Sequence, residues 1–138
     1  MSFVLDASMT VAWHFEDEAS PSVRRVAHRA FEEGVAVPQH WLVEVVSAGL
    51  RGERRTRAAP DRLEEFVAVL QDMPVEVDPA DADRLVAVLL PLAREHRLSI
   101  YDAAYLELAQ RLGFPLATLD APLADAARRL GIELIEGE

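Results

Sequence analysis

Residues 3–13 read Phe-Val-Leu-Asp-Ala-Ser-Met-Thr-Val-Ala-Trp: a short apolar run that ends at one acid and is followed at once by a second apolar segment. Residues 3–5 have the length and composition of a buried strand. Residues 8–13 are typical of the helix that such a strand leads into. The pattern predicts an α/β unit with Asp6 at the junction between strand and helix.

The rest of the chain repeats this alternation of short apolar runs and longer amphipathic segments. Ser20-Pro21 opens one helix, which Gly34 ends, and Ser99 opens a later helix, which Gly113 ends. Residues 58–60, Ala-Ala-Pro, form a hinge between two helices. We expect strands at 3–5, 35–38, 74–78, 115–119 and 132–135, and helices at 8–13, 21–33, 40–57, 61–71, 79–96, 99–112 and 122–130.

Strands that alternate with helices predict a parallel sheet, because parallel neighbours need crossover connections and these are usually helical. We therefore expect a three-layer α/β/α sandwich with a small parallel sheet of about five strands. The length of 138 residues fits a single domain spanning residues 1–138. Ligands of such sheets bind beyond the carboxyl ends of the strands, and Asp6 and Asp120 both fall at that edge.

The composition excludes several kinds of chemistry. The chain has no cysteine and its 14 basic residues are all arginine, so thiolate nucleophiles, zinc–thiolate sites and lysine-dependent mechanisms are excluded. The net charge of −10 would repel a polyanion unless cations or local arginine clusters intervene. No apolar run approaches the ~20 residues that span a bilayer, and no signal peptide is present, so we expect a cytoplasmic protein that does not bind membranes.

Four acids each stand alone in an apolar stretch, two at strand ends and two on helices. Burying an ionised carboxyl without a partner costs several kcal/mol, so residues of this kind are normally capped, paired or bound to a metal. Four anions in one small space would raise one another's pKa, and a hard divalent cation resolves that conflict. Oxygen ligands without cysteine favour Mg²⁺ or Mn²⁺ over zinc. The sequence therefore predicts one acidic metal pocket, formed by Asp6, Glu44, Asp102 and Asp120.

Three of these acids also have a purely structural interpretation. Asp6 could cap the first helix, and Asp120 could be a turn residue before Pro122. Ser99 and Asp102 have the spacing of a capping box, a role that can coexist with metal binding. Glu44 lies within a helix among apolar neighbours and has no capping role.

Other side chains are candidates for contact with RNA. Arginines cluster at residues 51–57, where they could bind phosphate or simply complement the helix dipole. His40 lies four residues before Glu44 and could face the site, or could have no role there. Four aromatic residues could stack on bases, although their apolar helical surroundings are more typical of core: Trp13, Trp41, Tyr101 and Tyr105.

Together, four motifs resemble those of PIN-domain ribonucleases, and most closely of VapC-type toxins. They are Val4-Leu5-Asp6-Ala7-Ser8, Pro38 followed by Glu44, Ser99-Ile100-Tyr101-Asp102-Ala103, and Leu116-Ala117-Thr118-Leu119-Asp120. The resemblance extends in order over essentially the whole chain. It implies a PIN-like fold and an Mg²⁺- or Mn²⁺-dependent endoribonuclease, the toxin of a type II toxin–antitoxin pair, which dimerises and is inhibited by a small cognate antitoxin.

The same resemblance implies a role for each acid. Asp6, Glu44, Asp102 and Asp120 would be the metal-binding catalytic residues, with Ser8 and Thr118 as polar support. The fourth acid varies most in the family, so Asp125 is an alternative to Asp120. The reaction implied is in-line attack of metal-activated water on an RNA phosphate, with tRNA, rRNA and mRNA all open as targets.

Two other functions compete with this interpretation. Receiver and phosphatase-type domains also gather aspartates at strand ends, but both usually need a lysine, and such phosphatases need an Asp-x-Asp motif where this chain has Asp6-Ala7-Ser8. The second alternative is a PIN-like module that binds RNA or protein without cleaving. The presence of all four acids argues against it.

Overall fold

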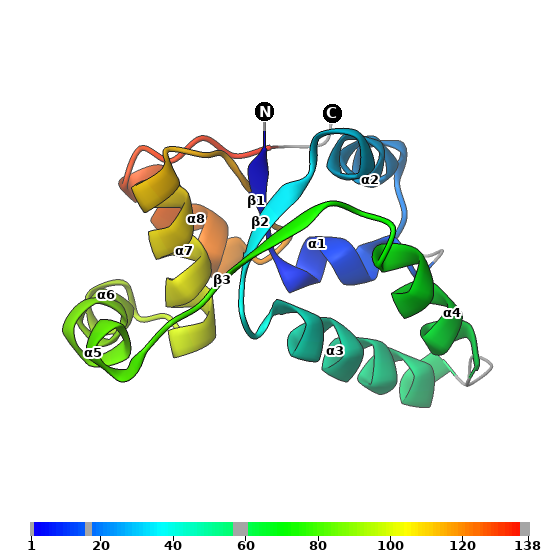
Figure 1. Ribbon diagram of the computed structural model, residues 1–138, viewed down its shortest axis with the longest axis horizontal. Coiled ribbons are helices and arrows are strands. Elements are labelled where there is room, and N and C mark those ends of the chain that lie inside the picture. Colours follow the sequence, from blue (N-terminus) through cyan, green and yellow to red (C-terminus); the bar gives the residue numbers. More distant parts are fainter. Residues whose placement is uncertain (1, 16–17, 57–60, 136–138) are drawn as a thin grey trace.

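The structure, a computed structural model, describes residues 2–15, 18–56 and 61–135. Figure 1 shows a twisted sheet at the centre of the molecule with helices on both sides. The sheet has four parallel strands in the order β3-β2-β1-β4. The predicted α/β/α sandwich is therefore confirmed, whereas the predicted hinge at residues 58–60 lies outside the described part of the chain.

The strands pair in a register centred on β1, where Val4 pairs with Ala36 on one side and with Leu116 on the other. Both central strands are buried throughout, as expected for parallel strands covered by helices on both faces. The four strands are β1 (Phe3–Leu5), β2 (Val35–Pro38), β3 (Val75–Asp78) and β4 (Leu116–Ala117).

The predicted fifth strand at residues 132–135 is wrong. In its place is an isolated parallel bridge between Leu134 and Leu116, with Ile135 N–H donating to the Leu116 carbonyl at 2.9 Å. Only the two residues of β4 are available for pairing, because the chain leaves the sheet at Thr118, whose hydroxyl hydrogen-bonds to Asp6. A two-residue partner is too short to support another regular strand.

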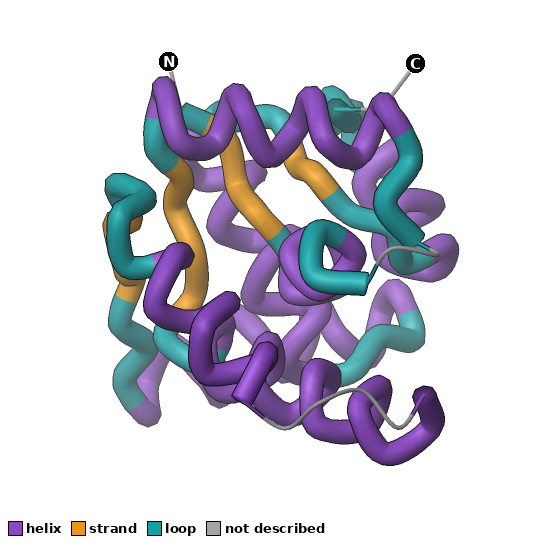
Figure 2. Tube along the Cα trace, turned by 90° about the vertical axis from the view of Figure 1, so that its right-hand side faces the viewer, coloured by secondary structure: helices purple, strands orange, loops and turns teal. Residues whose placement is uncertain are grey.

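The helices form two groups, one on each side of the sheet (Figure 1). The first group is α1 (Ala7–Ala12), α2 (Pro21–Glu33), α3 (Trp41–Thr56) and α4 (Asp61–Leu70). The second is α5 (Ala82–Arg84), η1 (Leu85–Leu89), α6 (Leu90–His96), α7 (Ile100–Leu112) and α8 (Ala121–Arg129). Figure 2, turned by 90° from Figure 1, shows the first group of helices in front of the sheet. None of the described helices is long and apolar enough to cross a membrane.

The helix predicted at 79–96 starts later, at Ala82, and is interrupted by the π-helical turn η1. Asp81 caps its first turn by accepting a hydrogen bond from Arg84 N–H at 2.9 Å. Pro91 follows η1 closely and has no amide hydrogen to donate, so the regular α-helical ladder cannot run unbroken through this segment. Hydrophobic spacing alone did not indicate this wider turn.

Helix α7 is the central helix of the second layer, and its residues 103–109 are all buried. One of them, Glu107, accepts hydrogen bonds from Arg84 at 2.5 Å and Arg111 at 3.0 Å, and Arg111 also pairs with Asp78 at 2.8 Å. Burial alone would raise the pKa of Glu107, but the hydrogen bonds from both arginines outweigh it and lower the pKa. This cluster joins β3, α5 and α7.

Replacing Glu107 by glutamine is expected to lower the free energy of unfolding by about 2 kcal/mol near pH 7. A lowered folded-state pKa contributes stability above the ordinary value of 4.5, and that contribution is lost as pH falls through the folded value. The difference between wild type and variant in urea unfolding should therefore shrink below about pH 4. The matched control is Asp125→Asn, which breaks an exposed pair with Arg128 and should change stability by less than about 0.5 kcal/mol.

Candidate active site

All four acids predicted from the sequence line one cavity of about 510 Å³. The chain runs from β1 outward through β2 to β3, and then returns to place β4 on the other side of β1. The crevice at such a reversal lies beyond the carboxyl ends of the strands, where the loops diverge. Asp6 follows β1 there and Asp120 follows β4, while α3 and α7 bring Glu44 and Asp102.

Asp6 is the most buried of the four acids, with 3% of its surface exposed. It occupies the N-cap position of α1, but its side chain makes no capping hydrogen bond. Its Oδ2 instead accepts hydrogen bonds from Ser8 at 2.6 Å and from Thr118 at 2.5 Å. Burial raises the pKa of Asp6, the two hydroxyls partly offset that effect, and the nearby Asp120 raises the pKa further. Capping does not explain this residue.

Ser8 and Thr118 connect the start of α1 to the end of β4. Besides their bonds to Asp6, the Ser8 hydroxyl accepts from Leu119 N–H at 2.9 Å, and the Thr118 hydroxyl accepts from Asp120 N–H at 3.0 Å. The polar support that the family resemblance implied is present in the contacts of both residues with Asp6. These bonds fix the position of the loop that carries Asp120.

A second, fully buried connection holds α1 against α3. Thr10 donates to the Asp6 carbonyl at 3.0 Å, and the Trp41 indole N–H donates to the Thr10 hydroxyl at 3.1 Å. Trp41 begins α3, so this chain of two hydrogen bonds sets the distance between Asp6 and the helix that carries Glu44. Trp41 is thus a core residue, the more typical of its two interpretations.

Glu44 lies in the first turn of α3 and is partly buried. Its Oε1 accepts a hydrogen bond from the Tyr105 hydroxyl at 2.8 Å and lies 3.4 Å from His40 Nε2. Burial raises the pKa of Glu44 to about 7, and the charges of Asp6 and Asp102 add to the effect. The Glu44 carboxylate therefore lies near two other carboxylates and accepts a hydrogen bond from the buried Tyr105 hydroxyl.

Asp102 and Asp120 complete the cavity from the other side of the sheet. Asp102 N–H donates to Ser99 Oγ at 3.1 Å, so Ser99 does cap α7. Burial raises the pKa of Asp102 to about 6, with further contributions from the charges of Asp120 and Asp6. Asp120 caps α8 by accepting from Leu123 N–H at 3.0 Å, so its structural role and its place in the cavity coexist.

Asp125 does not line the cavity. It is exposed on α8 and pairs with Arg128 at 3.1 Å. The alternative of Asp125 as the fourth acid is therefore not supported by its position, because helix α8 directs it away from the other three acids and toward solvent.

The donor set of the cavity suits a hard divalent cation, since it consists of carboxylate and hydroxyl oxygens. Burial raises the pKa of Asp6, Glu44 and Asp102, and repulsion from neighbouring carboxylates adds to it; a cation would relieve that repulsion. As placed, no three His, Asp or Glu side chains of the described residues lie close enough together to hold a metal ion. Mg²⁺ keeps several waters and often uses one or two carboxylates with a substrate phosphate, so it does not require a closed protein cage.

The part of the chain that carries these acids matches a known protein family. Residues 3–129 match the PIN domain over a range that includes all four acids. The chain belongs to the PIN-domain family. The resemblance predicted from four short motifs is therefore confirmed at the level of the family.

Individual relatives of this PIN domain are similar over nearly their whole length. Ribonuclease VapC3 of Pyrobaculum aerophilum is 29% identical over 127 residues, which is 91% of this chain and 94% of that protein. The crystal structure of VapC20, a sarcin–ricin loop cleaving toxin of Mycobacterium tuberculosis, superposes with a TM-score of 0.67 at 19% identity and covers 91% of this chain and 95% of that one. A further crystal structure from Pyrobaculum aerophilum has a TM-score of 0.62 at 23% identity, covering 91% and 84%. These structures support the fold.

Three other candidates from the sequence also line the acidic cavity of the PIN domain, namely His40, Arg51 and Tyr101. His40 is held at 3.3 Å from the Tyr101 carbonyl, beside Glu44. Arg51 reaches the cavity from α3 and donates to Ser47 at 3.0 Å, and its charge lowers the pKa of Glu44. Arg54 and Arg55 are exposed and do not line the cavity, and Arg57 lies outside the described residues.

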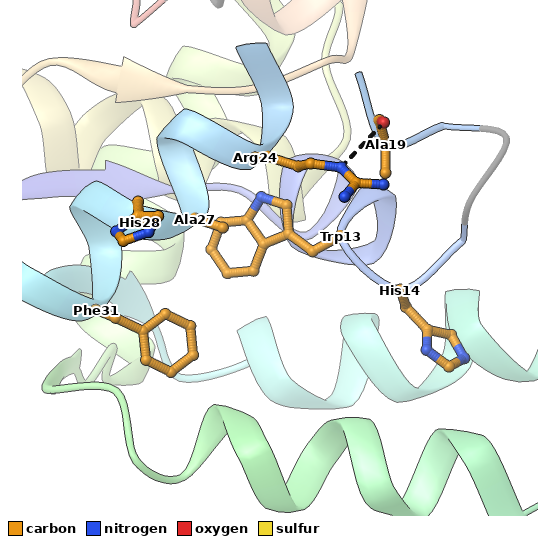
Figure 3. A pocket seen from close by; sticks show the side chains of 7 residues that line it. All are labelled: Trp13, His14, Ala19, Arg24, Ala27, His28 and Phe31. Carbon is orange, nitrogen blue, oxygen red and sulfur yellow. Dashed lines mark hydrogen bonds between the residues drawn. The ribbon is translucent and has the colours of Figure 1, made fainter. Parts of the chain in front are cut away.

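A separate cavity of about 400 Å³ lies between the end of α1 and α2, far along α1 from Asp6. Figure 3 shows Trp13 at its centre, with Arg24 and Phe31 on either side of the indole ring. No acid among the described residues lines it, and none of those residues accepts a hydrogen bond from Trp13 Nε1. This cavity lacks the oxygen ligands that phosphodiester hydrolysis requires.

Tyr105 is fully buried and donates a hydrogen bond to Glu44, a role that was not predicted from the sequence. A signal was available, because Tyr105 lies three residues after Asp102 and so shares a face of α7 with it. The hydrogen bond between Trp41 and Thr10 had no comparable sequence signal, since it joins residues 31 positions apart through neutral side chains.

Proposed function

We propose that this PIN domain is a metal-dependent endoribonuclease that cleaves RNA phosphodiesters, with Asp6, Glu44, Asp102 and Asp120 as its metal-binding catalytic residues. The observation that carries the proposal is the convergence of these acids on one cavity, where three of them have a raised pKa. Mg²⁺ or Mn²⁺ bound there would offset charge on the phosphodiester and promote ionisation of the attacking water. The similarity to VapC3 and VapC20 supports RNA as the substrate.

Other residues of the cavity orient the carboxylates and contact the substrate. Ser8 and Thr118 orient the Asp6 carboxylate, and Tyr105 orients that of Glu44. Arg51 is a cation on the cavity wall and can contact a backbone phosphate. No protein nucleophile is required, because water attacks and the cavity holds its charges in a fixed arrangement before the substrate arrives.

The proposed biological setting is that of a toxin in a type II toxin–antitoxin pair, active in the cytoplasm as a homodimer and inhibited by a small antitoxin. Exposed apolar residues support a protein partner at the cavity, since Val43 is 71% exposed and lines it, with Leu42 and Val46 beside it on α3. Light scattering on the purified protein tests the dimer. Co-purification with the product of a short reading frame directly upstream tests the antitoxin.

The activity is tested by incubating purified protein with total RNA and mapping the cleaved ends, with Mg²⁺, with Mn²⁺ and with EDTA. We expect cleavage with either ion and none with EDTA. Asp102→Asn should cleave at least about 100-fold more slowly, because it removes an oxygen anion from the cavity. Asp125→Asn makes the same chemical change outside the cavity and should cleave at the wild-type rate.

Two results would reject the proposal. Equal cleavage by wild type and Asp102→Asn would assign the activity to a contaminant or to another site. RNA binding without cleavage under any metal condition would favour the alternative of a non-cleaving RNA- or protein-binding module.

A further inference from the structure

A small hollow of about 160 Å³ adjoins the acidic cavity and shares His40 and Tyr101 with it. It is formed by the turn after β2, by η1 and by the first turns of α7. A group bound in the hollow would therefore lie next to the acidic cavity.

The lining of the hollow suits a neutral, flat group. Leu85, Leu89 and Ala104 provide apolar surface. The charged residues in its wall are already engaged, because Arg84 pairs with Glu107 at 2.5 Å and Asp78 pairs with Arg111 at 2.8 Å. An ionic ligand would have to break these pairs, whereas an uncharged ligand would not.

Tyr101 separates the two spaces and is 54% exposed, although it lies in the first turn of a helix that is otherwise mostly buried. Its ring packs edge-to-face against His40 with the ring centroids 5.0 Å apart. His40 also packs at 5.4 Å against Tyr105, which is buried and cannot move freely. The contact with His40 thus holds the Tyr101 ring in place, and the exposed part of Tyr101 lies beside the acidic cavity.

The π-helical turn η1 contributes Leu85 and Leu89 to the wall of the hollow. A π turn is rare because its hydrogen bonds are less favourable than those of an α-helix, and it occurs frequently at functional sites. Here the wider turn lies in the wall of the hollow that Tyr101 also lines.

We propose that this hollow is a nucleobase subsite, which takes an unpaired base of the RNA next to the cleaved phosphate and stacks it on Tyr101. The inference rests on the proposed ribonuclease function. Bases of single-stranded RNA stack on aromatic side chains in this way, whereas a base in a duplex would first have to unpair and unstack.

The test uses a short single-stranded RNA that the protein cleaves, and a copy of it with an abasic nucleotide next to the cleaved phosphate. On the intact RNA, Tyr101→Ala should raise KM about 10-fold with a smaller change in kcat, because stacking contributes to binding. Tyr101→Phe keeps the ring and should stay near wild type. On the abasic RNA, wild type and Tyr101→Ala should have the same KM, since the lost base and the lost ring belong to one contact.

A second variant approaches the hollow from its opposite wall. Ala80→Trp places a large side chain at a loop position that lines the hollow, and it should raise KM on the intact RNA but not on the abasic one. The subsite would be overturned if Tyr101→Ala raised KM by the same factor on the abasic RNA as on the intact RNA, because the two changes would then act independently.

Binding measurements separate failure of the subsite from failure of the ribonuclease proposal. Fluorescence anisotropy with the same two RNAs and the Asp6→Asn protein needs no cleavage. In that background, Tyr101→Ala should weaken binding of the intact RNA about 10-fold and leave binding of the abasic RNA unchanged. Equal affinity of both proteins for the intact RNA would reject the subsite, whether or not any RNA is cleaved.

Discussion

Asp6→Asn is expected to lower the rate of RNA cleavage by at least about 100-fold while raising the melting temperature of the metal-free protein. The two effects have the same cause. Asp6 is almost completely buried, and burial and Asp120 both disfavour its charged form. The amide is neutral and its oxygen can still accept from Ser8 and Thr118, so the fold loses a repulsion and the site loses an anion.

Cleavage assays and thermal unfolding in EDTA measure the two effects on the same preparation. Asp125→Asn, with its exposed carboxyl, is the matched control and should change neither quantity. Loss of activity together with a lower melting temperature would mean that Asp6 is needed mainly for folding, and the catalytic assignment would then fail.

Thermal stability without metal should fall as the pH rises from about 5 to about 8, and divalent cations should reverse that fall. The pKa of Glu44 is about 7 and that of Asp102 about 6, against ordinary values of 4.5 and 3.8. The folded protein therefore holds protons that the unfolded chain has released, and folding weakens as these protons are lost. Above about pH 8 the penalty is essentially complete, and a cation in the cavity compensates it.

Melting temperatures measured across this pH range, with EDTA and with Mg²⁺ or Mn²⁺, check the prediction. We expect a stabilisation by the cation on the order of a few °C at about pH 8 and little at about pH 5. In Asp102→Asn the benefit of the cation should shrink. A cation effect of equal size at both pH values would place the bound ion away from these carboxylates.

The features of the fold that could be predicted are those set by local sequence pattern. Alternation of apolar runs with amphipathic segments predicted the parallel sheet, and isolated acids at two strand ends and on two helices predicted which carboxyls line one cavity. Caps were equally local, since Ser20 accepts from Val23 N–H at 3.2 Å and Ser99 from Asp102 N–H at 3.1 Å.

The remaining features depend on tertiary contacts that no local pattern encodes. The bond from Tyr105 to Glu44 requires α7 and α3 to meet beneath the sheet edge, which depends on packing across the whole core. Pro91 interrupts the α-helical hydrogen bonds and so favours the η1 turn. The departure of the chain from the sheet at Thr118 leaves a single bridge where a fifth strand was predicted. The backbone structure of each of these segments depends on the residues that pack against it in the folded protein.

The placement of β4 beside β1 has a consequence for the order of events during synthesis. Asp6 leaves the ribosome early, but its partner Thr118 lies 112 positions later, and Asp120 follows it. Until that late segment docks, the nascent polypeptide carries three of the four acids, Asp6, Glu44 and Asp102, without the Thr118 hydroxyl that positions Asp6. The four acids that line the cavity are therefore brought together only after nearly the whole chain has been synthesised.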